Sequence, residues 1–296
     1  MTRHEVEPVD VSTAVLRDWR LPEPGPDKEA RGRTLIVGGS AQTPGSVLLA
    51  AEAALRSGAG KLQVATVRSV ASAIAVALPE ALVLALHETA DGAIDPSAAD
   101  DVLELAAEAS AVLIGSGSTG EAETTAFMAD LVPRLRGPLV IDALGLAYLT
   151  QDATRVEHLG GRVVLTPNRR ELAIMLSVDL DDVEQDPRRA AVELAARTRA
   201  TVAAGGPESW TASPDGRNWR DRSGGVGLGV SGSGDVLAGI VTGLCARGAE
   251  PAQAAVWAAF LHGRAGERLA TTVGRVGFLA REVPACVPLV LSEVEI

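Results

Sequence analysis

The chain has 296 residues, its hydrophobic content is 47%, and its formal net charge is −11. A chain of this length and composition folds into one large domain or two small ones, and a disordered or fibrous protein is excluded. The negative charge disfavours a protein that binds nucleic acid along its phosphate backbone. A nucleotide pocket is compatible with that charge, because backbone amides bind phosphate without net positive charge.

Three features of the chain favour a location in the cytoplasm. Residues 1–26 are charged and lack the apolar core of a signal peptide. The most apolar run, residues 69–86, is interrupted by a Pro-Glu pair, so it fits a buried helix followed by a strand better than a membrane span. Cys245 and Cys286 have no metal-ligand spacing and are interpreted as buried thiols, as in a reducing compartment. Neither a membrane nor a nucleic acid is therefore predicted as a partner.

Short apolar runs alternate along the chain with alanine-rich helical stretches. The first strand is predicted at residues 34–37, and a Gly-Gly-Ser turn and a helix at 44–57 follow it. Further strands are predicted at residues 61–67, 111–114, 138–141, 162–165 and 200–203. These runs are too continuously apolar to be half exposed, which is typical of a parallel sheet covered on both faces. The alternation predicts a doubly wound α/β fold with a mostly parallel sheet.

Small or polar residues follow each predicted strand. Ligands of open α/β sheets bind beyond the carboxyl ends of the strands. The candidate ligand loops are therefore residues 38–46, 115–120, Asp142, 166–171, 205–207 and 224–235. Within them, Ser46 and Gly117 are candidates for contact with a substrate through small side chains and backbone amides. The alternative is that their loops are plain turns between a strand and a helix.

The most informative segment is the glycine-rich loop at residues 224–235. It holds six glycines within eleven residues, too many for a stable helix or strand. The apolar helical period resumes directly after Asp235, and Gly248 is predicted to end that helix. The loop thus delivers its amides to a helix start, where free N–H groups and the helix dipole favour an anion. We predict a phosphate site there.

Asp235 stands at the start of that predicted helix and has two interpretations. It could cap the helix, since aspartate is a favoured N-cap residue. Beside an anion-binding loop, its carboxylate could instead take the proton from a hydroxyl that attacks a phosphoryl group. The two roles are compatible, and we predict that Asp235 is a catalytic base.

Two further residues have both a functional and a structural interpretation. Glu171 could hold magnesium through a bound water, because this ion binds through few carboxylates and keeps several waters. Glu171 could equally be a glutamate that the helix dipole favours at a helix start. His262 lies in an alanine-rich helix and is predicted to be a packed helix residue rather than a base.

Several segments carry a resemblance to a known family. The most specific are Pro-Gly-Ser at residues 44–46 and the alanine-rich run at 50–60, and the Gly-Asp segment at 234–239 adds to them. Together these segments resemble the NAD(P)H-hydrate dehydratases, a family of the ribokinase-like superfamily. The resemblance implies a ribokinase-like fold and a hydro-lyase that removes water from hydrated NADH or NADPH.

The resemblance also implies how that reaction proceeds. ADP or ATP would phosphorylate the hydroxyl of the hydrated nicotinamide ring, and loss of the phosphate would restore the cofactor. Asp235 would be the base on that hydroxyl, and Mg²⁺ would bind at Glu171. The substrate would contact Ser46, Gly117, Asn168 and Asp235, and the nucleotide would contact Ala204, Gly205, Gly206, Gly232, Ser233 and Gly234.

The chain departs from the family pattern at several positions. Leu144 replaces an aspartate, Asn168 replaces a histidine that contacts substrate, and Ala204 replaces a lysine near the nucleotide phosphates. Asn168 and Glu171 instead resemble the Asn-x-x-Glu motif of ribokinase-like small-molecule kinases. A kinase of a small alcohol, sugar or vitamin precursor therefore stays open as an alternative, as does a non-catalytic ligand-binding relative.

The resemblance finally implies an organisation for the whole chain. Residues 28–296 would form the catalytic domain, and residues 1–27 would be an N-terminal extension packed on it. A homo-oligomer is expected, a tetramer in the family pattern. Because only 27 residues precede Lys28, an epimerase that acts with the enzyme would be a separate protein.

Overall fold

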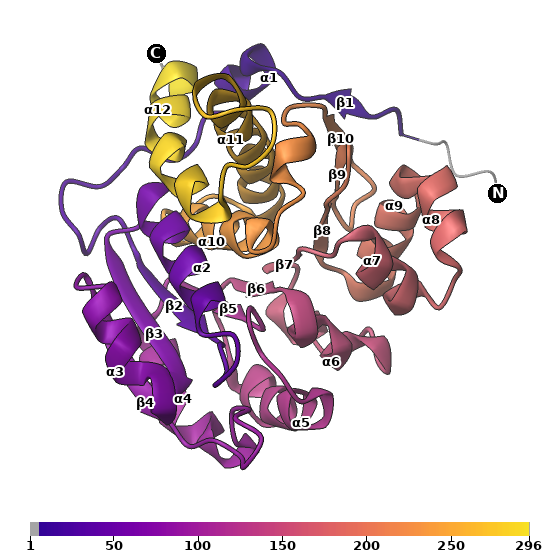
Figure 1. Ribbon diagram of the computed structural model, residues 1–296. Helices are drawn as coiled ribbons and strands as arrows, with labels where there is room; N and C mark the ends of the chain where they lie inside the picture. The colour runs from indigo at the N-terminus through magenta and orange to yellow at the C-terminus, as the bar shows by residue number, and fades with distance from the viewer. Residues whose placement is uncertain (1–5, 296) are drawn as a thin grey trace.

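The computed structural model describes residues 6–295, which fold around one ten-stranded sheet (Figure 1). The strands are β1 (Val9–Asp10), β2 (Arg33–Val37), β3 (Lys61–Val67), β4 (Ala81–Leu86), β5 (Ala111–Ile114), β6 (Leu139–Ile141), β7 (Val163–Leu165), β8 (Thr201–Ala204), β9 (Ser209–Ala212) and β10 (Asn218–Asp221). Their order across the sheet is β1-β10-β9-β8-β7-β6-β5-β2-β3-β4.

Most neighbouring strands in this sheet run parallel. Every pair from β8 across to β4 is parallel, whereas β9 is antiparallel to both β8 and β10. All four residues of β5 are buried, as expected for a strand with a helical layer on each side. The predicted doubly wound, mostly parallel sheet is thereby confirmed.

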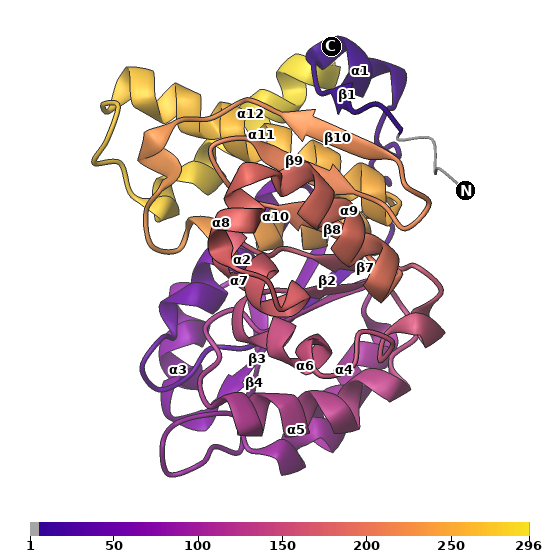
Figure 2. The ribbon, with the colours of Figure 1, turned by 90° about the vertical axis from the view of Figure 1, so that its right-hand side faces the viewer.

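Helices cover both faces of the sheet. They are α1 (Thr13–Asp18), α2 (Gly45–Arg56), α3 (Arg68–Ala77), α4 (Ala99–Glu108), α5 (Glu121–Leu131), α6 (Ala147–Thr150), α7 (Arg169–Leu176), α8 (Leu180–Gln185), α9 (Pro187–Thr198), α10 (Ser233–Ala246), α11 (Pro251–Thr272) and α12 (Val283–Glu295). Figure 2 shows α11 and α12 on one side of the molecule and α5 on the other.

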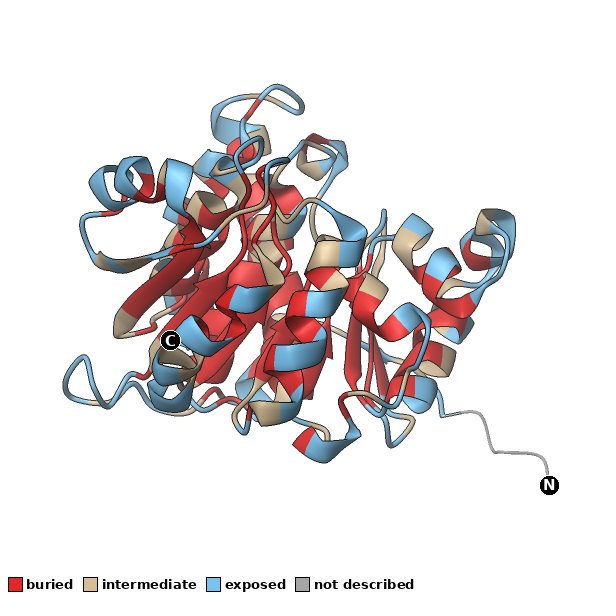
Figure 3. Cartoon of the chain, turned by 90° about the horizontal axis from the view of Figure 1, so that it is seen from below, coloured by how far each residue is buried: buried red, intermediate tan, exposed pale blue. Residues whose placement is uncertain are grey.

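Two hydrophobic cores lie between the helices and the sheet. Successive residues of a strand point to opposite faces, so Ile36 of β2 packs with α2, α10 and α11, whereas Leu35 and Val37 pack with α4, α5 and α7. Figure 3 shows that the strands are mostly buried and that the helices are exposed on their outer faces. Burial of both sheet faces explains why the strands appear in the sequence as unbroken apolar runs.

Close packing of α2 against α10 depends on glycines. A Cβ atom at Gly239 of α10 would lie 2.2 Å from the carbonyl oxygen of Ala50 in α2. A Cβ atom at Gly243 would lie 2.1 Å from the hydroxyl of Ser57. The two helix backbones therefore touch, which fixes the position of the loops from which each helix begins.

Two predictions about burial are wrong, and one pair of strands was missed. The run 69–86 forms a helix and then a strand, as predicted, but it is not buried as predicted: α3 buries only Ala71 and Ile74, and β4 is the outer strand of the sheet, with Leu82 53% exposed. Cys245 is buried, but Cys286 is only partly buried because it lies beside the inward face of α12 rather than on it. The pair β9 and β10 was not predicted from the sequence.

The N-terminal segment joins the sheet instead of lying apart from it. Strand β1 pairs with β10, and Trp19 stacks on Trp219 with ring centroids 5.3 Å apart. The first five residues of the predicted extension 1–27 lie outside the described part of the chain. No helix within residues 6–295 is long and apolar enough to cross a membrane.

Candidate functional site

The carboxyl ends of β5, β6 and β7 meet at a buried carboxylate, Asp142. Its two oxygens accept hydrogen bonds from the hydroxyls of Ser116 (2.8 Å) and Thr166 (2.7 Å). Burial raises the pKa of Asp142, and the two hydroxyl bonds oppose that rise. Three strand ends are thus joined through one polar group, at the edge of the sheet where the sequence predicts the ligand.

Asp235 lies in the first turn of α10, next to this group. The helix begins at Ser233, with Gly232 as its N-cap at a φ of +90°, so the helix starts earlier than predicted. The interpretation of Asp235 as the N-cap is therefore wrong, because Gly232 reaches the left-handed region that aspartate adopts at a cost. Asp235 is the third residue of the helix and remains near its positive end.

The surroundings of Asp235 move its titration close to neutral pH. Burial raises the pKa of Asp235 to about 6, and the charge of Asp142 acts in the same direction. Hydrogen bonds from the hydroxyls of Ser46 and Ser116 lower it again. A carboxylate with this pKa is half ionised near pH 6 and can accept a proton from a substrate at physiological pH.

The two predicted substrate loops lie against each other. The hydroxyl of Thr43 donates a hydrogen bond of 2.6 Å to the carbonyl oxygen of Gly117. Gly117 has a φ of +68°, and a Cβ atom there would lie 2.7 Å from the Cβ of Ser46. The structure therefore brings Ser46, Gly117 and Asp235 together, as expected for residues of one site.

The predicted phosphate loop has open space at its tip. Gly234 is exposed, and a Cβ atom there would meet nothing within 4 Å. Ser233 is buried, and its hydroxyl lies 3.0 Å from Nε2 of His262. Burial lowers the pKa of His262 to about 4, so its ring is neutral. His262 is a helix residue as predicted, but it also contacts the phosphate loop.

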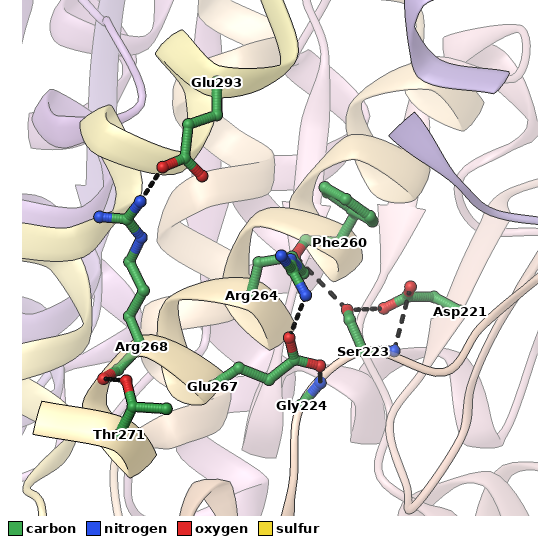
Figure 4. A network of polar contacts seen from close by, with 9 residues as sticks. All are labelled: Asp221, Ser223, Gly224, Phe260, Arg264, Glu267, Arg268, Thr271 and Glu293. Carbon is green, nitrogen blue, oxygen red and sulfur yellow. Dashed lines mark hydrogen bonds and ion pairs between the residues drawn. The ribbon is translucent and has the colours of Figure 1, made fainter. Parts of the chain in front are cut away.

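A polar network anchors the entry to the glycine-rich loop on α11 (Figure 4). The amide of Gly224 donates to Glu267 (2.9 Å), and Arg264 pairs with the same carboxylate. Beside it, the hydroxyl of Ser223 donates to Asp221 (2.6 Å). A hollow of about 190 Å³ lies next to this anchor, lined by Gly224, Gly225, Val226, Gly227, Gly266, Glu267, Ala270, Arg275 and Phe278.

The predicted nucleotide segment after β8 lies beside the loop after β7. The amide of Gly205 donates a hydrogen bond of 3.0 Å to the carbonyl oxygen of Pro167. Ala204 is only 3% exposed, whereas Gly206 is exposed and Gly205 is partly exposed. The backbone of this segment, and not the side chain of Ala204, is accessible to a ligand.

Asn168 and Glu171 form a capping box at the start of α7. The Asn168 side chain accepts from the Glu171 amide (3.0 Å), and the Glu171 carboxylate accepts from the Asn168 amide (2.8 Å). Burial raises the pKa of Glu171, as do the charges of Asp142 and Asp235 to a smaller extent. The structural interpretation of Glu171 as a helix-start residue is confirmed. Its carboxylate also lies close to the carboxylates of Asp142 and Asp235.

We expect Asn168→Ala to lower the free energy of unfolding by about 1 kcal/mol, because the variant loses the side-chain cap of α7. Asn168→Asp is the matched control, since aspartate also caps helices, and it should leave stability nearly unchanged. Urea denaturation followed by circular dichroism measures both variants. Equal stability of the alanine variant and the wild type would show that the cap contributes nothing.

The carboxylates of Asp142, Glu171 and Asp235 do not form a full cage of ligands for a metal ion. Within residues 6–295 no group of three or more His, Cys, Asp or Glu side chains could hold a metal ion. Magnesium, however, usually binds through one or two carboxylates, waters and substrate phosphates. Burial raises the pKa of Glu171, and the charges of Asp142 and Asp235 add to this rise, so a cation beside Glu171 would favour its ionised form.

Sequence reasoning found some of these residues and missed others. It placed Asp142 at a strand end without assigning it a role, and a polar residue directly after an apolar strand is the signal for it. It assigned nothing to Ser116 or Thr166 as partners of Asp142, which are 26 and 24 residues away in the chain. No sequence signal links Ser233 to His262.

A doubly wound sheet with a glycine-rich helix start and a half-buried carboxylate at its ligand edge defines an α/β enzyme fold of the ribokinase-like type. A ribokinase-like superfamily protein from Enterococcus faecalis has the same fold, with a TM-score of 0.82, 22% identity, and 97% and 96% of the two chains covered. Residues 34–288 match the family model described as NAD(P)H-hydrate dehydratase. The chain belongs to the NAD(P)H-hydrate dehydratase family.

Individual relatives agree with this assignment. An ADP-dependent (S)-NAD(P)H-hydrate dehydratase from Xanthomonas campestris is 46% identical, with 95% of this chain and 96% of that protein covered. The structure of an ADP/ATP-dependent NAD(P)H-hydrate dehydratase from Bacillus subtilis, co-crystallised with ATP and Mg²⁺, has a TM-score of 0.79 at 27% identity and covers 97% and 99% of the two chains.

Some relatives are longer than this chain. A bifunctional NAD(P)H-hydrate repair enzyme from Moorella thermoacetica is 35% identical, with 89% of this chain covered. The match spans 50% of that protein, so the chain corresponds to about half the length of such bifunctional relatives.

Proposed function

We propose that the protein is an ADP- or ATP-dependent hydro-lyase that dehydrates NADH hydrate and NADPH hydrate and so repairs damaged nicotinamide cofactors. The observation that carries this proposal is Asp235, a carboxylate with a pKa of about 6 directly beside a glycine-rich helix start. Family membership and the activity named for the Xanthomonas relative support it. A base next to a phosphate site is the arrangement that phosphoryl transfer to a hydroxyl requires.

The reaction proceeds in two steps on the hydrated ring. Asp235 accepts the proton of the ring hydroxyl. At the same time, the oxygen of that hydroxyl forms a bond to the terminal phosphorus of the nucleotide. The nucleotide leaves one phosphate shorter, and the amides of Gly232, Ser233 and Gly234 offset the charge on the moving phosphoryl group. The carbon–oxygen bond then breaks and inorganic phosphate departs. The neighbouring ring carbon loses a proton to water, and the electrons of that carbon–hydrogen bond restore the double bond of the ring.

The remaining site residues divide between the two ligands. The positions of Ser46 and Gly117 beside Asp235 support contact with the hydrated ring, and Asn168 joins them in this proposal. The backbone of residues 204–206 lines the nucleotide. The hollow of about 190 Å³ beside the glycine-rich loop would take its nucleoside part.

Magnesium is part of this proposal. Glu171 would hold the ion through water, with Asp142 and Asp235 close by. When bound, the ion would neutralise charge on the nucleotide phosphates. Burial raises the pKa of Glu171, and the charges of Asp142 and Asp235 add to this rise, which supports a cation beside these carboxylates.

The direct test mixes the protein with NADH hydrate, Mg²⁺ and either ADP or ATP and follows the recovery of NADH absorbance. Recovery with at least one nucleotide is the expected result, and no recovery with either one refutes the proposal. Because Asn168 and Glu171 resemble the Asn-x-x-Glu motif of small-molecule kinases, the alternative is a kinase that would release a stable phosphorylated alcohol. Mass spectrometry of the products distinguishes that kinase from a dehydratase, which releases inorganic phosphate.

The pKa of Asp235 predicts the pH dependence of turnover. Because only the ionised carboxylate accepts a proton, kcat/KM should fall about tenfold per pH unit below pH 6 and level off above it. Asp142→Asn removes a charge that raises the pKa of Asp235, so it should move this acidic limb to lower pH. Stopped-flow rates between pH 5 and 9 measure the profile. An acidic limb at the same pH in both proteins would contradict the assignment of the limb to Asp235.

We also propose the organisation that the resemblance implies. Residues 28–296 form the catalytic domain, with residues 1–27 as an extension whose strand β1 joins the sheet. A homotetramer, a separate epimerase and a cytoplasmic location remain predictions. Size-exclusion chromatography with light scattering tests the oligomeric state.

A further inference from the structure

The side chain of Arg169, the first residue of α7, lies on the loop after β8. A Cβ atom at Gly206 would meet Nε of Arg169 at 2.5 Å and Nη2 at 3.0 Å. A glycine at position 206 therefore allows the guanidinium to rest directly on the backbone of this loop. Figure 1 shows α7 beside the ends of β7 and β8.

The guanidinium of Arg169 has no anionic partner among residues 6–295. Its Nε is buried and donates no hydrogen bond to any of residues 6–295, and no described carboxylate is paired with it. A buried charged donor without a partner is costly, because it has lost its water without gaining a replacement. In a chain with a net charge of −11, such an arginine is a strong candidate for binding a charged ligand.

The backbone around Arg169 holds it firmly in this place. The capping box between Asn168 and Glu171 fixes the start of α7, and the amide of Gly205 is bonded to Pro167 at 3.0 Å. The two loops thus form one platform. The guanidinium of Arg169 lies against these loops next to residues 204–206, whose backbone is accessible.

The residue at position 204 suggests what Arg169 binds. The family resemblance implies a lysine near the nucleotide phosphates at this position, whereas Ala204 is uncharged and 3% exposed. We propose that Arg169 supplies the missing cation and binds the phosphates of the nucleotide; this inference rests on the proposed function of residues 204–206. A guanidinium binds phosphate through two parallel N–H donors, which a lysine cannot do.

The test is calorimetric titration of the full chain with ATP, ADP and adenosine at a fixed Mg²⁺ concentration. Arg169→Ala should weaken ADP and ATP binding about 10- to 100-fold, the size expected for charge-assisted hydrogen bonds, and leave adenosine binding unchanged. Arg169→Lys should keep part of the affinity. Arg170→Ala, the exposed neighbouring arginine, is the matched control and should bind all three ligands like the wild type.

A second variant tests whether charge at this loop is what matters. A side chain at Gly205 would meet nothing within 4 Å of its Cβ atom, so a lysine fits there. Adding Gly205→Lys to the Arg169→Ala protein should restore part of the ADP affinity. Thermal melts of each variant establish that it is folded before titration.

Two results would overturn the inference: ADP affinity in Arg169→Ala equal to that of the wild type, or an equal loss of adenosine and ADP binding. A wild-type protein that binds none of the three ligands also overturns it. The titration uses no hydrated cofactor and is therefore independent of the dehydration assay. Selective loss of ADP binding in a protein that leaves NADH hydrate unchanged would support this inference and refute the proposed function.

Discussion

Replacing Asp235 by asparagine should lower the rate of dehydration by about 10³-fold, the size typical of losing a positioned general base. The amide has nearly the same shape, so nucleotide binding should change little. Single-turnover recovery of NADH measures the rate, and calorimetry with ADP measures the binding. Asp91→Asn, which changes an exposed loop carboxylate, is the control and should keep full activity. Unchanged turnover in Asp235→Asn would show that Asp235 is not the general base.

The same substitution should also stabilise the protein at neutral pH. Because the pKa of Asp235 rises from 3.8 to about 6 on folding, the folded chain disfavours the ionised carboxylate. Well below pH 3.8 the carboxyl is protonated in both states and this penalty is absent. As pH rises from 4 to 6, the wild type loses stability that the asparagine variant keeps, and above pH 6 the difference is complete.

Urea denaturation at pH 4 and pH 8 measures this difference. Asp235→Asn should unfold at higher urea than the wild type at pH 8 and at similar urea at pH 4. A gain in stability on replacing a catalytic residue is expected where the site is functional at the expense of stability. Equal midpoints at pH 8 would show that the environment of Asp235 does not disfavour its charge.

The parallel part of the sheet was predictable because both of its faces are buried. The predicted strands 61–67 and 111–114 coincide with β3 and β5, whose residues are almost all buried. The pair β9 and β10 was missed because Ser209–Ala212 and Asn218–Asp221 mix polar and apolar residues without an unbroken run. Their antiparallel pairing depends on a partner strand, which no local pattern reveals.

The functional site was predictable only where one segment of sequence carries it. The glycine-rich loop and Asp235 are such a segment, and the structure places them at the expected edge of the sheet. The partners of Asp142 and the contact of Arg169 with Gly206 join residues that are far apart in the chain. Their chemistry arises from the fold, so the sequence contains no local signal for it.

Gly239→Ala tests how the fold holds the site together. Alanine favours a helix over glycine by about 1 kcal/mol, so an isolated helix would be stabilised by this change. In the protein the new Cβ would lie 2.2 Å from the carbonyl oxygen of Ala50 and force α2 away from α10. We therefore expect a net loss of about 2 kcal/mol in the free energy of unfolding, as for other overpacked cores. Gly45→Ala is the control, because a Cβ there meets nothing within 4 Å.

The displacement should also lower activity in the fraction that stays folded. Ser46 lies in the first turn of α2 and Asp235 in the first turn of α10, so separating the helices moves the two residues apart. The hydroxyl of Ser46 lowers the pKa of Asp235, and losing that hydrogen bond should raise the pKa. Urea denaturation and the pH profile of kcat/KM, measured on the same variant, should show lower stability together with an acidic limb at higher pH. Lower stability with an unchanged pH profile would mean that the helix pair supports the fold without positioning the base.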